Sequence, residues 1–203
     1  MSQIVLPLSL GHGDDPVRIV TGNANAAAAE ALAEPAAWPF RTAILAGPRR
    51  SGRSLLGRWF AESGRGAFLD DADRMDETVM FHRWNRAQEE GEALLLAVPD
   101  SGWEIALPDL QSRLGAALTL EIGTPDDEML AALIEAHAEQ RGLALGEGAL
   151  TYLVPRATRS FAAVEKLVAE IDRLSLERKV PATLAIWRAA LDAVEGPEQA
   201  RLL

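Results

Sequence analysis

The chain has 203 residues, of which 48% are hydrophobic and 25% are charged, and its formal net charge is −10. This composition is typical of a globular protein that is large enough for two compact units, and the absence of cysteine excludes disulfides and thiolate metal sites. No apolar run could cross a bilayer, no secretory signal is evident, and the acidic charge argues against DNA as the main partner. We therefore expect a cytoplasmic protein with no membrane contact and no direct sequence-specific binding of DNA.

The first element is a short apolar segment, residues 2–8, which contains Pro7 and precedes a loop-like stretch at 11–16. Proline disfavours a central strand because it cannot donate a hydrogen bond to the ladder. Two interpretations stay open from the residues alone. The segment is either a peptide that docks on another protein or an edge strand that packs on its own domain.

A phosphate-binding loop is predicted at residues 47–54. An alanine-rich helix at 24–34 and an apolar strand at 42–46 precede it, and a helix begins after it. The spacing is Gly, four residues, Gly, a basic residue and Ser, with arginine where lysine is usual. Backbone N–H groups and the helix N-terminus would hold a polyphosphate; the alternative is a glycine-rich turn without a ligand. The predicted nucleotide-binding residues are Gly47, Pro48, Arg49, Arg50, Ser51, Gly52, Arg53 and Ser54.

Two carboxylates, Asp70 and Asp71, follow a second predicted strand at 66–69. Carboxylates in this position are the partner that a phosphate loop requires. Asp70 would hold Mg²⁺ together with the hydroxyl of Ser54, and Asp71 would polarise the attacking water. The alternative is an ordinary boundary between strand and turn, where Asp is common.

The remaining elements divide the chain into an α/β part and a helical part. A helix at 76–90, a strand at 93–98, a helical turn at 107–114 and a strand at 117–122 complete the predicted parallel sheet. Every later element is predicted to be helical, with segments at 124–142, 148–156, 160–178 and 182–194. We expect a peptide and linker at 1–16, an α/β core at 17–123 and a helical domain at 124–203.

Together these motifs resemble those of the AAA+ ATPase family, in its DnaA and Hda branch, over about residues 3–194. The phosphate loop resembles a Walker A motif, residues 68–71 resemble a Walker B motif, and the segment from Val20 to Asn25 resembles the one that wraps the nucleotide base. Residues 108–114 resemble the segment that ends in the arginine finger. The resemblance implies an AAA+ parallel sheet with a small all-α lid, and it gives Arg113 the role of reaching a neighbour's γ-phosphate.

The N-terminal segment resembles the Q-x-x-L-P-L form of the peptide that binds the β sliding clamp. By that resemblance Gln3, Leu6, Pro7 and Leu8 would contact the clamp. The chain also stops where the DNA-binding domain of DnaA would begin, which agrees with the acidic charge.

The chain departs from the family pattern in three places. Asp70 follows Ser54 by only 16 positions (54 to 70), so we expect one strand and its helix to be missing, which leaves four core strands. The strand at the sensor 1 position ends in an apolar run, 96–98. The sensor 2 position falls near Ala162, where Arg159, about one turn earlier, is the candidate substitute. These departures predict weak or absent hydrolysis by the chain alone.

The resemblance implies a regulator of replication initiation that carries ADP or ATP with Mg²⁺, binds the β sliding clamp and stimulates ATP hydrolysis by DnaA. The alternatives are a self-sufficient ATPase that uses Asp71, an adaptor with a decayed nucleotide site, and a DNA-binding truncated initiator. Pairing of two copies of the chain is also compatible with the sequence.

Overall fold

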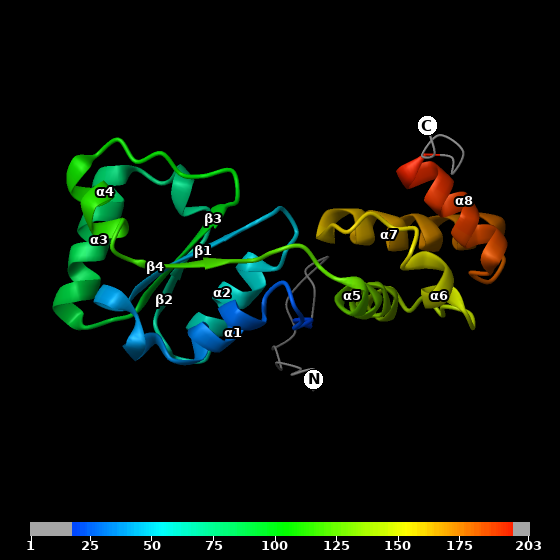
Figure 1. The fold of residues 1–203 in the computed structure, drawn as a ribbon, viewed down its shortest axis with the longest axis horizontal. Coiled ribbons are helices and arrows are strands. Elements are labelled where there is room, and N and C mark those ends of the chain that lie inside the picture. Colours follow the sequence, from blue (N-terminus) through cyan, green and yellow to red (C-terminus); the bar gives the residue numbers. More distant parts are fainter. Residues whose placement is uncertain (1–17, 197–203) are drawn as a thin grey trace. The chain divides into compact units, whose positions relative to one another are not determined.

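The computed structural model describes residues 18–196, which divide into two compact units. One unit is Asn25–Gly123, and the other combines residues 18–24 with residues 124–196. Figure 1 shows an α/β arrangement in the first unit and helices in the second. No helix between residues 18 and 196 has the length and apolar character needed to cross a membrane.

The α/β unit is built on a sheet of four parallel strands in the order β2-β3-β1-β4. The strands are β1 (Thr42–Gly47), β2 (Ala67–Leu69), β3 (Leu94–Pro99) and β4 (Leu118–Glu121). In the register Leu45 lies opposite Ala97 on β3 and Leu120 on β4. Residues 94–98 of β3 are all buried, because helices cover both faces of a parallel sheet. The sheet thus has the four strands predicted from the short spacing between the two motifs.

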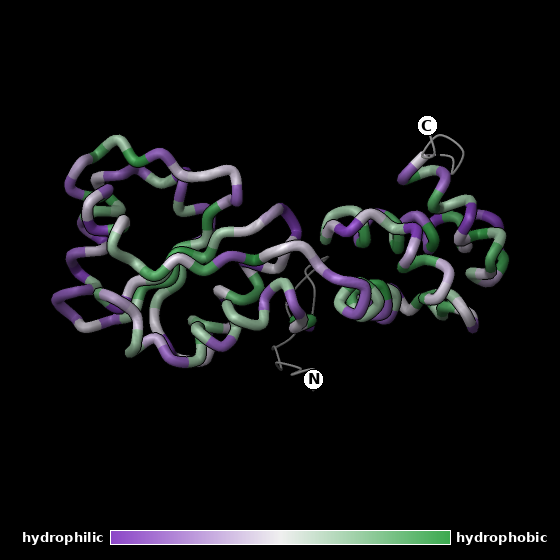
Figure 2. The backbone as a smooth tube through the Cα atoms, viewed as in Figure 1, coloured by the Kyte–Doolittle hydropathy of each residue, from purple (hydrophilic) through white to green (hydrophobic). Residues whose placement is uncertain are grey.

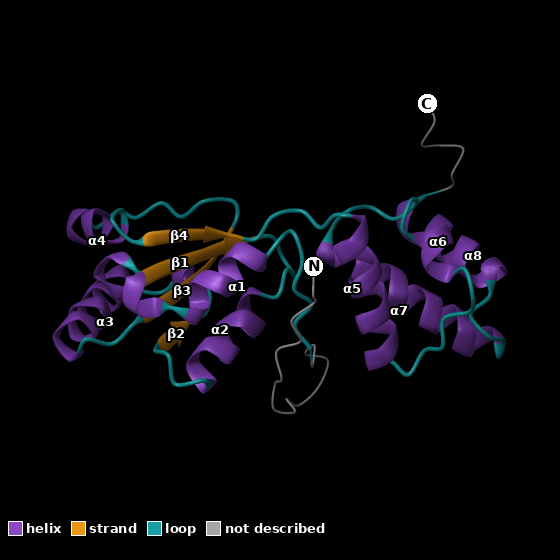
Figure 3. Ribbon diagram, turned by 60° about the horizontal axis from the view of Figure 1, so that its bottom comes forward, coloured by secondary structure: helices purple, strands orange, loops and turns teal. Residues whose placement is uncertain are grey.

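Helices form a layer on each side of this sheet (Figure 3). On one side lie α3 (Glu77–Glu90) and α4 (Pro108–Leu114), which share a buried core with alternate residues of β3. On the other side lie α1 (Ala26–Ala33) and α2 (Arg53–Glu62). Gly57 of α2 has no room for a Cβ, because ring atoms of Phe68 would lie 2.1 to 2.4 Å from it. Helix α2 therefore packs directly on β2. Short 3₁₀ turns, η1 (Pro35–Ala37), η2 (Pro39–Arg41) and η3 (Ala72–Arg74), connect the elements.

The helical unit contains α5 (Asp127–Gln140), α6 (Ala149–Leu153), α7 (Phe161–Arg178) and α8 (Leu184–Glu195). Asp126 caps α5, where its carboxylate accepts a hydrogen bond of 2.9 Å from the N–H of Met129. Figure 2 shows hydrophobic residues along both the central strands and these helices, as expected for two separate cores. On the surface of α7, a hydrogen bond from Arg173 lowers the pKa of Glu170.

Residues 18–24 belong to the helical unit, whereas the sequence pattern predicts them in the α/β core. The amide of Asn23 donates to the carbonyl of Thr124 at 3.1 Å, and its oxygen accepts from the N–H of Asp126 at 3.0 Å. Arg18 forms an ion pair of 3.3 Å with Glu139 on α5. These contacts link positions more than 100 residues apart, which explains why local patterns do not predict them.

Candidate functional site

The predicted phosphate loop connects β1 to α2 by a turn with two left-handed residues. Arg50 has φ 65° and Gly52, which precedes the first turn of α2, has φ 87°. A left-handed arginine is uncommon and often marks a functional site. Gly47 ends β1 where a Cβ would lie 2.9 Å from Ile122 and 3.0 Å from the hydroxyl of Ser51, so no other residue fits without a shift. The chain is thus closely packed at the start of the loop, where Gly47 contacts Ile122 and Ser51.

Two buried polar atoms in this loop have no hydrogen-bond partner among residues 18–196. They are the Oγ of Ser51, a residue 5% exposed, and one terminal nitrogen of Arg53. Buried polar groups without partners are costly, so such atoms indicate a missing ligand or water. Both are hydrogen-bond donors at the N-terminus of a ten-residue helix, which favours an anion. The residues present therefore fit a phosphate group.

Asp70 and Asp71 follow β2 directly, and both are exposed to solvent. The N–H of Asp71 donates to the carboxylate of Asp70 at 3.1 Å, and Asp71 has φ 45°. Because β3 lies between β2 and β1, two strand spacings, about 10 Å, separate the acidic pair from the phosphate loop. The parallel sheet brings both motifs to its carboxyl edge. Within residues 18–196, no group of three His, Asp or Glu side chains could hold a metal alone.

Arg113 lies in the last turn of α4 and packs on α3. Its guanidinium carbon lies 4.4 Å from the ring centroid of Phe81 and 4.8 Å from that of Trp84. One terminal nitrogen donates a hydrogen bond to the side-chain oxygen of Asn85. Two cation–π contacts and a hydrogen bond hold the half-buried guanidinium in one orientation. Sequence reasoning did not identify Asn85, although its spacing of four from Phe81 places both on one helix face.

Trp84 fixes the position of Arg113 along the sheet. Its indole N–H donates to the hydroxyl of Thr42 at 3.1 Å, and Thr42 is the first residue of β1. The phosphate loop begins at Gly47, at the other end of that strand. Five residues of extended chain separate the two ends, which corresponds to about 16 Å. Arg113 therefore sits toward the amino end of β1, away from the phosphate loop of its own chain.

Comparison with known families matches residues 126–191 to the lid domain of Hda. A Haemophilus influenzae protein without an assigned function is 27% identical over 119 residues, which cover 57% of this chain and 52% of that protein. The initiator DnaA of Thermus thermophilus is 27% identical over 134 residues, 65% of this chain and 30% of DnaA. The chain thus spans about half of these curated relatives or less.

Domain III of the Thermotoga maritima initiator DnaA has the same fold. It superposes with a TM-score of 0.71 at 15% identity and covers 88% of this chain and 95% of the DnaA domain. The chain is thus similar to DnaA-related AAA+ proteins, and its residues 126–191 are similar to the lid domain of Hda. The α/β unit accordingly has the fold of an AAA+ core, and the match to the Hda lid domain falls in the helical unit, which we call the lid.

Val20 and Arg159 both lie in the unit that contains the lid. Val20 is buried at 9% exposure, and Arg159 forms an ion pair of 2.8 Å with Asp127 at the start of α5. Both side chains of that pair are more than half exposed, so it contributes little to stability. The predicted role of Arg159 at the sensor 2 position remains a prediction. Gln3, Leu6, Pro7 and Leu8 lie outside the described residues.

The AAA+ core also places Asp100, which was not among the predicted site residues, next to the phosphate loop. Its N–H donates to the carbonyl of Gly47 at 3.2 Å, and its side chain is exposed. The strand at the sensor 1 position is apolar through Val98, but a carboxylate follows it two residues later. The signal in the sequence is an acid shortly after the predicted buried strand at 93–98.

Proposed function

We propose that this protein regulates the initiation of chromosome replication by stimulating ATP hydrolysis in DnaA, with Arg113 as the catalytic residue supplied across the interface. The observation that carries this proposal is the position of Arg113. The guanidinium of Arg113 is held against α3, near the amino end of β1. The phosphate loop of the same chain follows the carboxyl end of β1. A guanidinium near the amino end serves a phosphate bound to a different molecule.

The chemistry required of Arg113 is electrostatic. A phosphoryl group in transfer spreads negative charge over its oxygens, and a guanidinium that donates to them stabilises that charge. Stabilisation of this kind is most effective when the donor is oriented before the reaction, because little reorganisation is then needed. The contacts of Arg113 with Phe81, Trp84 and Asn85 supply such orientation in the absence of the partner.

We further propose that the chain's own loop binds ADP or ATP, mainly in a structural role. The buried donors of Ser51 and Arg53 would reach a phosphate group, and Ser54 with Asp70 would hold Mg²⁺ between the loop and the acidic pair. Asp71 would polarise the attacking water. Because β3 ends in apolar residues and arginine replaces the loop lysine, we expect slow turnover at this site.

The N-terminal peptide would bring the protein to the site of replication. Gln3, Leu6, Pro7 and Leu8 match the pattern of a clamp-binding peptide, in which the leucines fill an apolar pocket and the glutamine bonds at its edge. Deletion of residues 1–8 should abolish retention on clamp-loaded DNA and leave the stability of the AAA+ core unchanged.

The proposal is tested by the steady-state release of phosphate from ATP-loaded DnaA with clamp-loaded DNA. The wild-type chain should accelerate release, and Arg113→Ala should reduce the stimulation by about a thousandfold, since arginine fingers contribute factors of this order. Arg178→Ala, a charge change in the lid at the end of α7, is the matched control and should stimulate normally. Normal stimulation by Arg113→Ala would overturn the proposal.

A further inference from the structure

The turn that leads into β1 holds two consecutive residues in a conformation rare for bulky side chains. Phe40 has φ 50° and Arg41 has φ 47°, so both are left-handed, and neither is glycine. Such a conformation persists only when the surrounding contacts determine it, and it is concentrated at functional sites. We call Pro39, Phe40 and Arg41 the corner.

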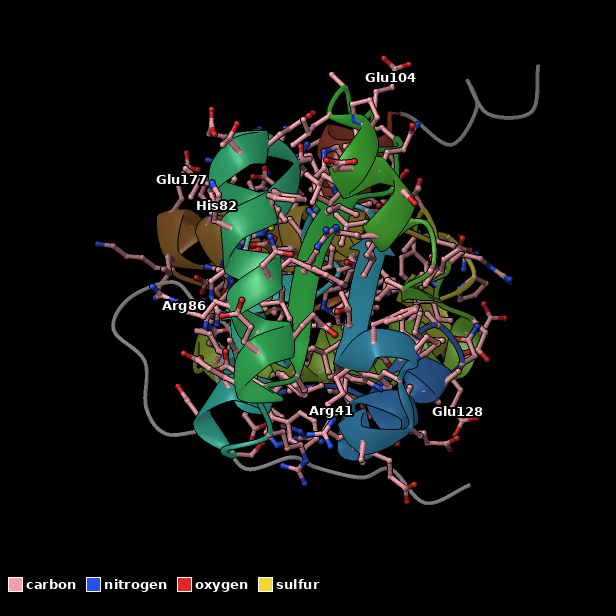
Figure 4. All side chains as sticks on the ribbon, turned by 90° about the vertical axis from the view of Figure 1, so that its left-hand side faces the viewer. Arg41, His82, Arg86, Glu104, Glu128 and Glu177 are labelled. Carbon is pink, nitrogen blue, oxygen red and sulfur yellow. The ribbon has the colours of Figure 1, made fainter. Side chains whose placement is uncertain are left out.

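Hydrogen bonds to Thr42, Gln88 and Gly91 hold the corner in place. The carbonyl of Phe40 accepts from the hydroxyl of Thr42 at 2.9 Å and from the side-chain amide of Gln88 at 2.8 Å. The guanidinium of Arg41 donates to the carbonyl of Gly91 at 2.7 Å, just past the end of α3. Figure 4 shows Arg41 beside this end of the helix. The corner is thus anchored on α3 and β1, and its shape is set before any partner arrives.

The anchored corner presents an aromatic ring to solvent. Phe40 is 57% exposed, and it is the one aromatic residue among the large hydrophobic side chains that are exposed between residues 18 and 196. A rigid exposed aromatic loses little conformational entropy when a partner covers it, which is why such residues often dominate binding energy. The fold thus maintains both an unfavourable backbone conformation and an exposed ring at one place.

The corner is continuous with the residues that hold Arg113. The ring centroids of Phe40 and Trp84 lie 6.4 Å apart, and the guanidinium carbon of Arg113 lies 4.8 Å from Trp84. These two distances place the Phe40 ring within about 11 Å of Arg113. An interface of standard size buries about 800 Å² on each partner, equivalent to a disc of about 16 Å radius. A protein that receives Arg113 near the centre of such an interface would also cover Phe40.

We propose that the corner is a docking contact for the same DnaA-type partner whose nucleotide Arg113 reaches, with Phe40 as the apolar anchor and Arg41 as the charged contact beside it. This inference rests on the proposed function. The partner surface would offer an apolar recess for the ring and a carboxylate at its rim for the guanidinium. The corner would supply affinity, and Arg113 would supply catalysis.

The two roles separate in a titration of ATP-loaded DnaA with the full-length chain on clamp-loaded DNA. The measurement gives the chain concentration for half-maximal stimulation and the maximal rate. Phe40→Ala should raise the half-maximal concentration by about tenfold or more and leave the maximal rate within about twofold of wild type. Arg113→Ala should abolish the stimulation of DnaA at every concentration of the chain. Leu176→Ala removes a side chain that is 70% exposed in the lid and is the matched control.

Phe40→Gly guards against a loss of folding, because glycine adopts a φ of 50° without strain. This variant should melt at or above the wild-type temperature and still show the raised half-maximal concentration. If both Phe40 variants fold and titrate as wild type while Arg113→Ala is inactive, the docking inference is wrong and the proposed function stands. If Arg113→Ala stimulates normally, the proposed function itself fails, and the docking inference fails with it.

Discussion

The side chains with proposed roles at the two ends of the sheet differ in whether their polar groups have hydrogen-bond partners. At the carboxyl end, the buried donors of Ser51 and Arg53 have no partner in the described part of the chain. Toward the amino end, Arg113, Trp84 and Arg41 each have a hydrogen-bond partner on a neighbouring element. Buried donors without partners are suited to receive a ligand, whereas side chains held by hydrogen bonds are suited to present fixed contacts. The comparison supports a nucleotide at one end and a protein partner at the other.

The largest effect at the carboxyl end should come from Arg53→Ala. Loss of a charged hydrogen bond in a buried site should weaken ADP binding by about a hundredfold. The measurement is calorimetric titration with ADP and Mg²⁺. Arg65→Ala, which removes a guanidinium 4.8 Å from the ring of Trp59 and beyond the far end of α2, should bind ADP as wild type does. Equal loss in both variants would show that the loop has no special role.

At the amino end, Asn85→Ala should lower the maximal stimulation of DnaA by about tenfold. Without its acceptor, the guanidinium of Arg113 gains freedom over the rings, and catalytic groups lose activity when their position is less defined. ADP binding should not change, because Asn85 lies on α3, away from the phosphate loop. Thr78→Ala, at the exposed start of α3, controls for helix substitutions. A loss of ADP binding in Asn85→Ala would show that the two ends of the sheet do not act independently, which would contradict the comparison.

A smaller effect with an unusual sign is expected for Ser51→Ala. The hydroxyl has no partner without ligand, so its removal should leave the melting temperature of the nucleotide-free protein equal or slightly higher. ADP affinity should fall by about threefold to tenfold. Ser63→Ala should show the reverse pattern, because that hydroxyl donates to the carbonyl of Phe60 at 2.9 Å at the end of α2. Differential scanning fluorimetry with and without ADP separates the two patterns.

The sheet was predictable because its determinants are local. The apolar run at 93–98 predicts a buried strand, and the short spacing from Ser54 to Asp70 leaves no room for a fifth strand. The turn between β1 and α2 was predictable for the same reason, since its glycines and basic residue lie close together in the sequence.

Other features depend on contacts between distant residues and could not be predicted. The grouping of residues 18–24 with the lid rests on the hydrogen bonds of Asn23 to Thr124 and Asp126. The corner contains no glycine, so the sequence Pro39-Phe40-Arg41 does not predict a left-handed conformation. The packing of Arg113 required α3 and α4 to meet, and the sequence predicted both helices without their contact.

The central claim is that Arg113 acts on a nucleotide bound by another molecule. The most direct test is a single-turnover experiment in which either DnaA or this chain is preloaded with radiolabelled ATP before the two are mixed on clamp-loaded DNA. The account predicts rapid conversion of the label to ADP when DnaA carries it, little conversion when this chain carries it, and no acceleration with Arg113→Ala. Rapid conversion of the label on this chain, with the label on DnaA unchanged, would contradict the account.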